Sequence, residues 1–98
     1  MYMKTYVEGK TIMVALCDES VIGKIFTEDE LILDLKNYAS FYKGEKVDEE
    51  TASRALLSAT SANLVGKKSV ALAEKLGLIK KKDVKMVGGT PHVQIYHV

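Results

Sequence analysis

The first part of the chain alternates between apolar and polar positions in a way that predicts a β-hairpin. Residues Tyr2 to Glu8 alternate, and residues Thr11 to Cys17 are rich in β-branched and apolar side chains, and both patterns are typical of strands. Gly9 and Lys10 suit the centre of a tight turn between them, because glycine readily adopts a positive φ. Since Ile12 to Leu16 is apolar at every position, we expect the second strand to lie inside the sheet with both faces covered.

Two more short strands are predicted after polar turns. Residues Val21 to Phe26 form one, and residues Leu31 to Lys36 form the next, with alternate leucines on one face. The following stretch, Tyr38 to Lys46, has no clear periodicity, so no regular structure is predicted there. The first half of the chain is therefore expected to be a meander of strands.

The pattern changes to a helical period at Asp48, a good N-cap whose side chain can accept hydrogen bonds from free backbone amides. Two helices are predicted, joined through Asn63-Leu64-Val65-Gly66 and ending at Gly77, which fits the left-handed C′ position. The apolar stripes consist of Ala52, Ala55, Leu56 and Ala59 in the first helix, and of Val70, Leu72, Ala73 and Leu76 in the second. The two helices are expected to pack as a helical hairpin.

The chain closes with two more predicted strands, Val84 to Val87 and His92 to His97, across a four-residue Gly-Gly-Thr-Pro loop. The predicted fold class is α+β: a mainly antiparallel sheet of short strands, with the helical hairpin inserted before a C-terminal β-hairpin. A chain of 98 residues is long enough for one hydrophobic core and too short for two. Residues 1–98 are therefore expected to form a single domain.

The composition favours a globular protein of the cytoplasm. Hydrophobic residues make up 47% and charged residues 28% of the chain, so neither disorder nor a fibrous repeat is expected. The single cysteine, Cys17, excludes an internal disulfide and is typical of a reducing compartment. The longest apolar run, Ile12 to Cys17, is far too short to span a bilayer, so no membrane association is expected.

Charge is divided unevenly along the chain. Residues 1–65 carry seven Lys or Arg against eleven Asp or Glu, a net charge of −4, whereas residues 66–98 carry seven lysines against Glu74 and Asp83, a net charge of +5. A basic segment favours an anionic partner, although solvation of exposed surfaces explains the same lysines. We therefore hypothesise a non-catalytic accessory protein that binds RNA or a ribonucleoprotein. The candidate nucleic-acid-binding residues are Asn63, Lys67, Lys68, Lys80, Lys81, Lys82, His92 and Tyr96.

A second hypothesis is a small-ligand-binding protein or enzyme built around the last strand. Alternation there places His92, Gln94 and Tyr96 on one face. Histidine exchanges protons near neutral pH, and glycine amides can approach an anion. The candidate ligand-binding residues are Gly88, Gly89, His92 and Gln94. No motif specifies a reaction, so no catalytic residue, metal ligand or cofactor is assigned.

A third hypothesis is a protein-interaction module that forms a homodimer through an exposed edge strand such as Tyr2 to Glu8.

The predicted helix pair also resembles a helix-turn-helix in outline, with Lys67 and Lys68 at the start of its second helix. That helix offers few side chains for reading bases, so sequence-specific duplex recognition is not favoured.

Several segments of the chain resemble one known family. They are Cys17-Asp18-Glu19 with Gly23-Lys24, Phe41-Tyr42 with Gly44, Ala62-Asn63-Leu64-Val65-Gly66, and Gly88-Gly89 before Pro91-His92-Val93-Gln94-Ile95. In this order and at these separations, they are similar to the small archaeal proteins of domain-of-unknown-function family four-two-four. The resemblance spans nearly the whole chain and implies a single cytoplasmic α+β domain, with no activity or residue roles to carry over. By analogy, it suggests an association with the translation apparatus.

Overall fold

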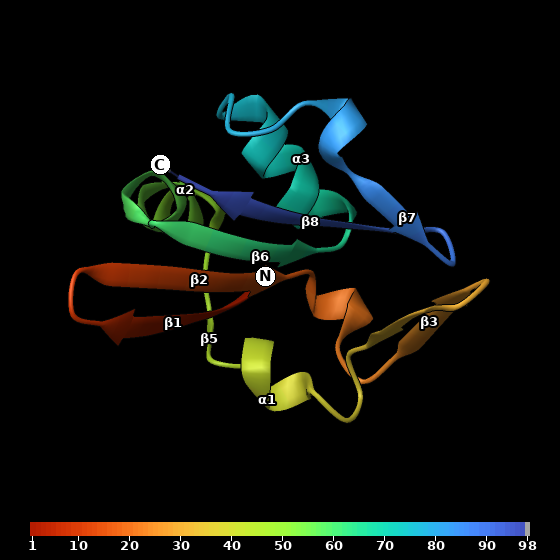
Figure 1. The fold of residues 1–98 in the computed structure, drawn as a ribbon. Coiled ribbons are helices and arrows are strands. Elements are labelled where there is room, and N and C mark those ends of the chain that lie inside the picture. The colour runs from red at the N-terminus through yellow and green to blue at the C-terminus, as the bar shows by residue number, and fades with distance from the viewer. Residues whose placement is uncertain (98) are drawn as a thin grey trace.

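A six-stranded sheet forms the centre of the computed structural model, which describes residues 1–97 (Figure 1). The strands are β1 (Tyr2–Glu8), β2 (Thr11–Cys17), β3 (Ile25–Glu28), β4 (Leu31–Asp34), β5 (Glu45–Lys46), β6 (Ser61–Val65), β7 (Lys85–Val87) and β8 (Thr90–Tyr96). The helices are α1 (Ala39–Tyr42), α2 (Glu49–Ser58) and α3 (Lys67–Lys75), with two 3₁₀ turns, η1 (Glu19–Val21) and η2 (Lys81–Asp83). None of the helices in this part of the chain is long and apolar enough to cross a bilayer.

The large sheet is mixed, with strand order β5-β1-β2-β6-β8-β7. β2 and β6 are parallel, and the other pairs in this sheet are antiparallel. A parallel pair needs a crossover connection. Here the chain leaves β2 and forms the small β3–β4 sheet, α1, β5 and α2 before it returns as β6. The α+β class and the C-terminal β-hairpin are confirmed, while the parallel pair was not predicted.

The predicted helical hairpin is wrong, because a strand separates the two helices. Residues Ser61–Val65 form β6, which lies between β2 and β8 in the middle of the sheet. Ala62 and Leu64 pack into the core on one face of the sheet, and Val65 packs into the core on the other. Pairing on both edges and burial on both faces decide the conformation of so short a segment, whatever its helical neighbours prefer.

Other elements differ from the prediction at their boundaries. The stretch expected to form a strand at 21–26 is divided between the end of η1 and the start of β3 at Ile25. The next strand ends at Asp34, two residues earlier than predicted. The unassigned stretch 38–46 contains α1 and β5. Short elements of this kind have weak local signals, so tertiary contacts set their limits.

Two tight turns close the hairpins of the large sheet. The first, at Gly9 and Lys10, has a positive φ at Gly9, as predicted. The second is shorter than predicted, because Gly88 and Gly89 alone connect β7 to β8 and residues 90–91 belong to β8. Both glycines have positive φ, which two-residue hairpin turns of this kind require.

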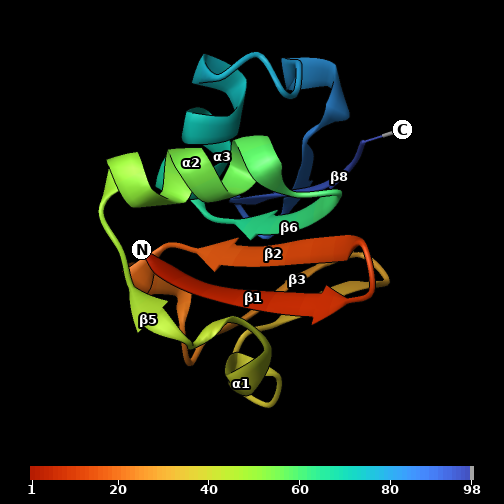
Figure 2. The ribbon, with the colours of Figure 1, turned by 90° about the vertical axis from the view of Figure 1, so that its left-hand side faces the viewer.

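Helices α2 and α3 cover one face of the sheet, and α1 with the β3–β4 hairpin lies on the other side (Figures 1 and 2). Leu56 of α2 packs with Leu64 on the helical face, and Leu35 packs with Cys17 on the opposite face. Residues 14–17 of β2 are fully buried, which confirms the prediction that this strand lies inside the sheet. We call the face opposite α2 and α3 the open face.

Candidate functional site

The open face carries a groove, here called the open-face groove, between β4 and β8. It consists of two adjoining cavities of about 520 and 330 Å³ that share Leu33 and His92. The larger cavity extends toward β7, and the smaller extends toward α1. The polar and aromatic residues that line the groove are Asp34, Tyr38, Phe41, Tyr42, Asn63, Asp83, Lys85, His92, Gln94 and Tyr96.

Three side chains meet where the two cavities join. Asn63 Oδ1 accepts a hydrogen bond from the Tyr42 hydroxyl at 2.6 Å and lies 3.0 Å from His92 Nε2. The three residues come from α1, β6 and β8, so distant segments must fold together to form this cluster. Since a carbonyl oxygen only accepts, His92 carries its proton on Nε2 and leaves Nδ1 as an acceptor.

His92 and Tyr42 are both uncharged at physiological pH. Burial lowers the pKa of the His92 imidazole below its usual value of 6.5, and the charge of Lys85 lowers it further. Burial likewise raises the pKa of the Tyr42 hydroxyl well above its usual value. The centre of the groove is therefore a neutral network with fixed donors and acceptors.

The last strand adds a polar and aromatic row on the same face, as the alternation predicted. Gln94 and Tyr96 are exposed, and the Tyr96 hydroxyl donates to Gln94 Oε1 at 3.1 Å. Tyr96 is 72% exposed, and Tyr38, which lines the other cavity, is 67% exposed. Exposed aromatic rings in both cavities provide surfaces on which a planar ligand can stack.

Neither His92 nor Cys17 is arranged as part of a nucleophile–base pair. His92 Nε2 is bonded to an amide, whereas an activated nucleophile needs a hydroxyl or thiol in that place. Cys17 is fully buried, and burial, together with the charge of Asp18, raises the pKa of its thiol to about 12. It is neither accessible nor ionised near neutral pH. Within residues 1–97, no three His, Cys, Asp or Glu side chains are placed to hold a metal ion.

The candidate ligand-binding residues do not gather in one place. His92 and Gln94 line the open-face groove, whereas Gly89 lines a separate cavity of about 250 Å³. The amide of Gly88 donates to a carboxylate oxygen of Glu28 at 3.2 Å, so it is already occupied. Gly88 and Gly89 therefore form the hairpin turn, and only His92 and Gln94 belong to the groove.

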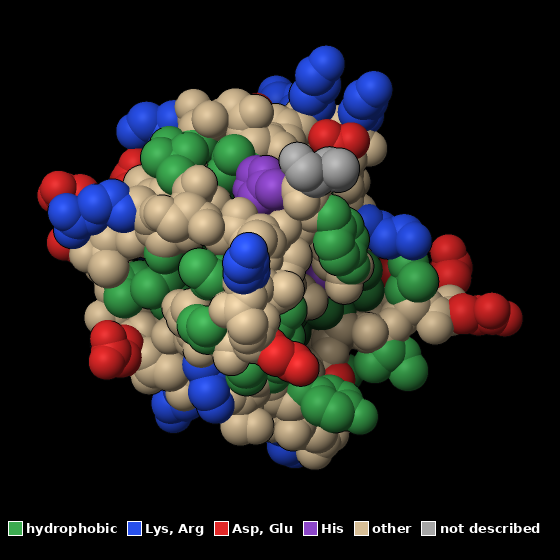
Figure 3. Space-filling model, turned by 60° about the vertical axis from the view of Figure 1, so that its left-hand side comes forward, with side chains coloured by type: hydrophobic (Ala, Val, Ile, Leu, Met, Phe, Trp, Pro, Cys, Tyr) green, Lys and Arg blue, Asp and Glu red, His purple; other side chains and the backbone are tan. Residues whose placement is uncertain are grey.

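The candidate nucleic-acid-binding residues are divided between the two sides of the molecule. Asn63, His92 and Tyr96 lie in the open-face groove. The lysines lie beside α3 and η2: Lys67 and Lys81 line one cavity, Lys68 lines another, and Lys80 and Lys82 are exposed. On the face drawn in Figure 3, some Lys and Arg side chains gather near the top of the view beside an acidic group, and others lie separately, some of them next to acidic side chains. The candidate residues therefore lie on different parts of the surface.

The start of α3 is occupied by Asp18, which follows β2. Its carboxylate accepts hydrogen bonds from the backbone amides of Lys68 and Ser69 at 2.9 and 2.8 Å, and from the Ser69 hydroxyl at 2.8 Å. A helix start with free amides attracts phosphate, but these two amides already have a carboxylate partner. A phosphate near the lysines at this end of α3 would therefore not find these two amides free.

Tyr42 is one of the site residues that sequence reasoning missed, together with Tyr38 and Lys85. Its one signal was the aromatic pair Phe41-Tyr42 in a stretch without assigned structure. Phe41 stacks on Tyr6 of β1 with ring centroids 5.2 Å apart, and the Tyr6 hydroxyl donates to the Phe41 carbonyl at 2.8 Å. These contacts fix α1 under the sheet and direct Tyr42 toward Asn63. No local pattern encodes that approach.

Together, the fold and the groove define a small α+β protein with an aromatic-lined groove on one face of its sheet and an uncharged hydrogen-bonded cluster at the centre of that groove. The chain belongs to the family described as "Protein of unknown function (DUF424)", whose model matches residues 5–98. The family resemblance noted in the sequence is thereby confirmed.

A solved structure shares this fold. It is the crystal structure of an uncharacterized conserved protein from Methanopyrus kandleri, with a TM-score of 0.82 and 24% sequence identity over 99% of this chain and 90% of that chain. Similarity at this level of identity shows the fold alone. A comparison with curated proteins gave no match.

Proposed function

We propose that the protein is a non-catalytic, cytoplasmic accessory protein that binds single-stranded RNA and holds one unpaired base in the open-face groove. The observation that carries this proposal is the exposure of Tyr38 and Tyr96 in the two cavities that meet at His92. Unpaired RNA bases stack on aromatic side chains and offer their edges to hydrogen-bonding groups. A duplex hides both features, so single strands are the expected ligand.

The polar centre of the groove supports recognition of a base edge. His92 offers an acceptor at Nδ1, because its proton lies on Nε2. Gln94 offers donors and an acceptor beside the Tyr96 ring. Since His92 is neutral, these groups recognise an uncharged ring by hydrogen bonding and need no ionic partner.

Cations near the groove are few, and this sets the expected salt dependence. Lys85 lines the groove, but Asp34 and Asp83 line it too. Lys82 is exposed just before β7. We therefore expect contact with only about one or two phosphates and a shallow fall of affinity with salt. Stacking on the tyrosines should contribute the larger part of the affinity.

The proposal is tested by fluorescence anisotropy with a short labelled single-stranded RNA, its duplex and the matching single-stranded DNA. The Tyr96→Ala variant should weaken RNA binding by about tenfold, because it removes a stacking surface. Leu57→Ala is the matched control, since Leu57 is 59% exposed on α2, on the opposite side of the sheet. Equal affinity of Tyr96→Ala and the parent protein, or a preference for the duplex, would contradict the proposal.

A second pair of variants tests the contribution of charge. Replacing Lys82 and Lys85 with alanine should weaken binding and flatten its dependence on salt. Replacing Lys10 and Arg54, which lie in the turn after β1 and on α2, removes the same charge away from the groove and should leave the slope unchanged. If both double variants behave alike, the phosphates do not follow the β7 side of the groove.

A free planar ligand is the alternative occupant, because the groove is of a size for one heterocycle with its polar edge on His92 and Gln94. Nucleoside monophosphates, added to the same assay as competitors, distinguish the two functions. If a mononucleotide binds as tightly as the oligonucleotide and replacing Lys82 and Lys85 has no effect, the protein is a small-ligand binder. Competition only at far higher concentration favours RNA.

A further inference from the structure

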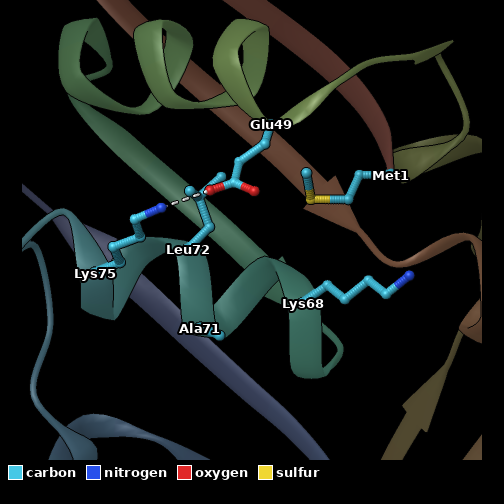
Figure 4. A pocket seen from close by; sticks show the side chains of 6 residues that line it. All are labelled: Met1, Glu49, Lys68, Ala71, Leu72 and Lys75. Atoms are coloured by element: carbon cyan, nitrogen blue, oxygen red, sulfur yellow. Dashed lines mark hydrogen bonds and ion pairs between the residues drawn. The ribbon is translucent and has the colours of Figure 1, made fainter.

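Helix α3 is flanked by a groove on each side, away from the open face. The α2–α3 groove, about 460 Å³, is lined by Met1, Leu72 and Lys68 among others, and Figure 4 shows it from close by. The α3–β7 groove, about 380 Å³, lies between α3 and the segment from η2 to β7. Both grooves are lined by Ala71, an exposed residue on the outer side of the helix.

The floors of these grooves are apolar and contain no aromatic side chain. Leu72 lines the first, and Val70, Val84, Met86 and Pro91 line the second. Met86 is 46% exposed, so an apolar side chain lies open to a partner. An RNA base would find no ring to stack on here, unlike in the open-face groove. Apolar side chains of a protein fit this surface better.

The rims carry an excess of positive charge. Lys67 and Lys81 line the α3–β7 groove together with Glu74, and Lys68 and Lys75 line the α2–α3 groove together with Glu49. One of the two carboxylates is already paired, because Lys75 reaches across to Glu49 at 3.1 Å (Figure 4). The remaining lysines favour a partner with acidic side chains.

We infer that the two grooves and Ala71 between them form a docking surface for an acidic amphipathic helix of a partner protein. The helix crosses α3 at Ala71, where the small side chain permits close approach of the two axes. Its apolar side chains enter the grooves on either side of Ala71, as anchors spaced along one helix face. Its glutamates or aspartates face Lys67, Lys68 and Lys81.

The probe is a synthetic peptide of about four helical turns with leucines on one face and glutamates elsewhere. Titrated into isotope-labelled full-length protein, it should shift the amide NMR signals of residues 67–75 and 81–86. The same peptide with lysines in place of glutamates should bind at least about tenfold more weakly. A short single-stranded RNA is titrated in parallel.

Two substitutions of one residue separate docking from folding. Ala71→Glu places a bulky anion between the grooves and should weaken peptide binding by about tenfold or more, while its helix propensity remains high. Ala71→Ser changes size little and should bind within about twofold of the parent protein. The inference is overturned if the acidic peptide shifts no signals at millimolar concentration, if the lysine peptide binds equally well, or if RNA shifts the α3 signals instead. Because RNA binding is read at Tyr96, failure of one proposal leaves the other standing.

Discussion

The carboxylate of Asp18 holds the buried side chain and amide of Ser69, which lies 51 positions later in the chain, at 2.8 Å from each. Asp18 follows the central strand β2, and Ser69 lies in the first turn of α3. Two N-terminal amides of the helix are therefore satisfied by a residue that directly follows a central strand and not by a local side-chain cap. This contact fixes α3, and the surface it carries, relative to the parallel strands.

Removing this carboxylate should destabilise the fold more than removing a local cap. Asp18→Ala leaves two helix amides and a buried hydroxyl without partners, and we expect a loss of about 3 kcal/mol in the free energy of unfolding. Asp48→Ala is the matched control. Asp48 is exposed and caps α2 through a single hydrogen bond from the Thr51 amide at 2.8 Å. Its loss should be about 1 kcal/mol. Urea unfolding of both variants measures these two losses. Equal losses would contradict the prediction that the Asp18 carboxylate stabilises the fold more than a local cap does.

Gly66 should tolerate a methyl group much less well than Gly77, although both have positive φ. A Cβ at Gly77 meets no atom within 4 Å, so Gly77→Ala should cost only the backbone strain, about 1–2 kcal/mol. A Cβ at Gly66 collides with the side chain of Asp18, and its backbone conformation is one that only glycine adopts freely. Thermal unfolding of Gly66→Ala and Gly77→Ala should show the larger loss for Gly66, and the reverse order would refute the collision.

The Tyr42 hydroxyl should contribute to stability through Asn63. Tyr42→Phe removes a 2.6 Å hydrogen bond in the interior of the open-face groove and should cost about 1 kcal/mol. Tyr38→Phe makes the same chemical change on a ring that is 67% exposed, and its effect should lie within about 0.5 kcal/mol. The comparison by chemical unfolding isolates the buried bond. An unchanged free energy of unfolding in Tyr42→Phe would show that the hydrogen bond to Asn63 does not contribute to stability.

Acidification should destabilise the protein through His92. Burial lowers the pKa of this imidazole in the folded state below its usual 6.5, so the unfolded chain binds the proton more readily. Stability is then fully present above about pH 6.5 and is lost as the pH falls through the folded pKa. The melting temperature should fall more between about pH 7.5 and 5 for the parent protein than for His92→Gln, which does not titrate in this range. An NMR titration that places the His92 pKa above 6.5 would reverse the expectation.

Features with local signals were accessible from the sequence. The Gly9 turn needs only two residues, and the Asp48 cap lies three positions before the amide that it binds. The end of α3 is equally local: Gly77 donates to the Glu74 carbonyl and Leu78 to the Ala73 carbonyl, both at 3.0 Å, as the left-handed glycine predicted. In each case, one short stretch of chain contains all the partners.

Features that depend on distant partners were not accessible. Nothing near Ser61–Val65 reveals that β2 and β8 pair with both of its edges. The groove shows the same limit: alternation placed His92 and Gln94 on one face, but only the folded chain brings Tyr42 to Asn63. The charge asymmetry was real in the sequence, yet the fold places Lys67, Lys68 and Lys81 beside α3, away from the polar row of β8 that Lys85 adjoins.

The parallel pairing of β2 with β6 also has a consequence for folding during synthesis. As the protein emerges from the ribosome, the β1–β2 hairpin comes first, and the inner edge of apolar β2 has no partner until residues 18–60 have followed. An uncovered apolar strand edge invites pairing with other chains. The nascent chain therefore exposes this edge during the interval between the synthesis of β2 and that of β6, and β6 ends the interval by pairing with β2 and then with β8.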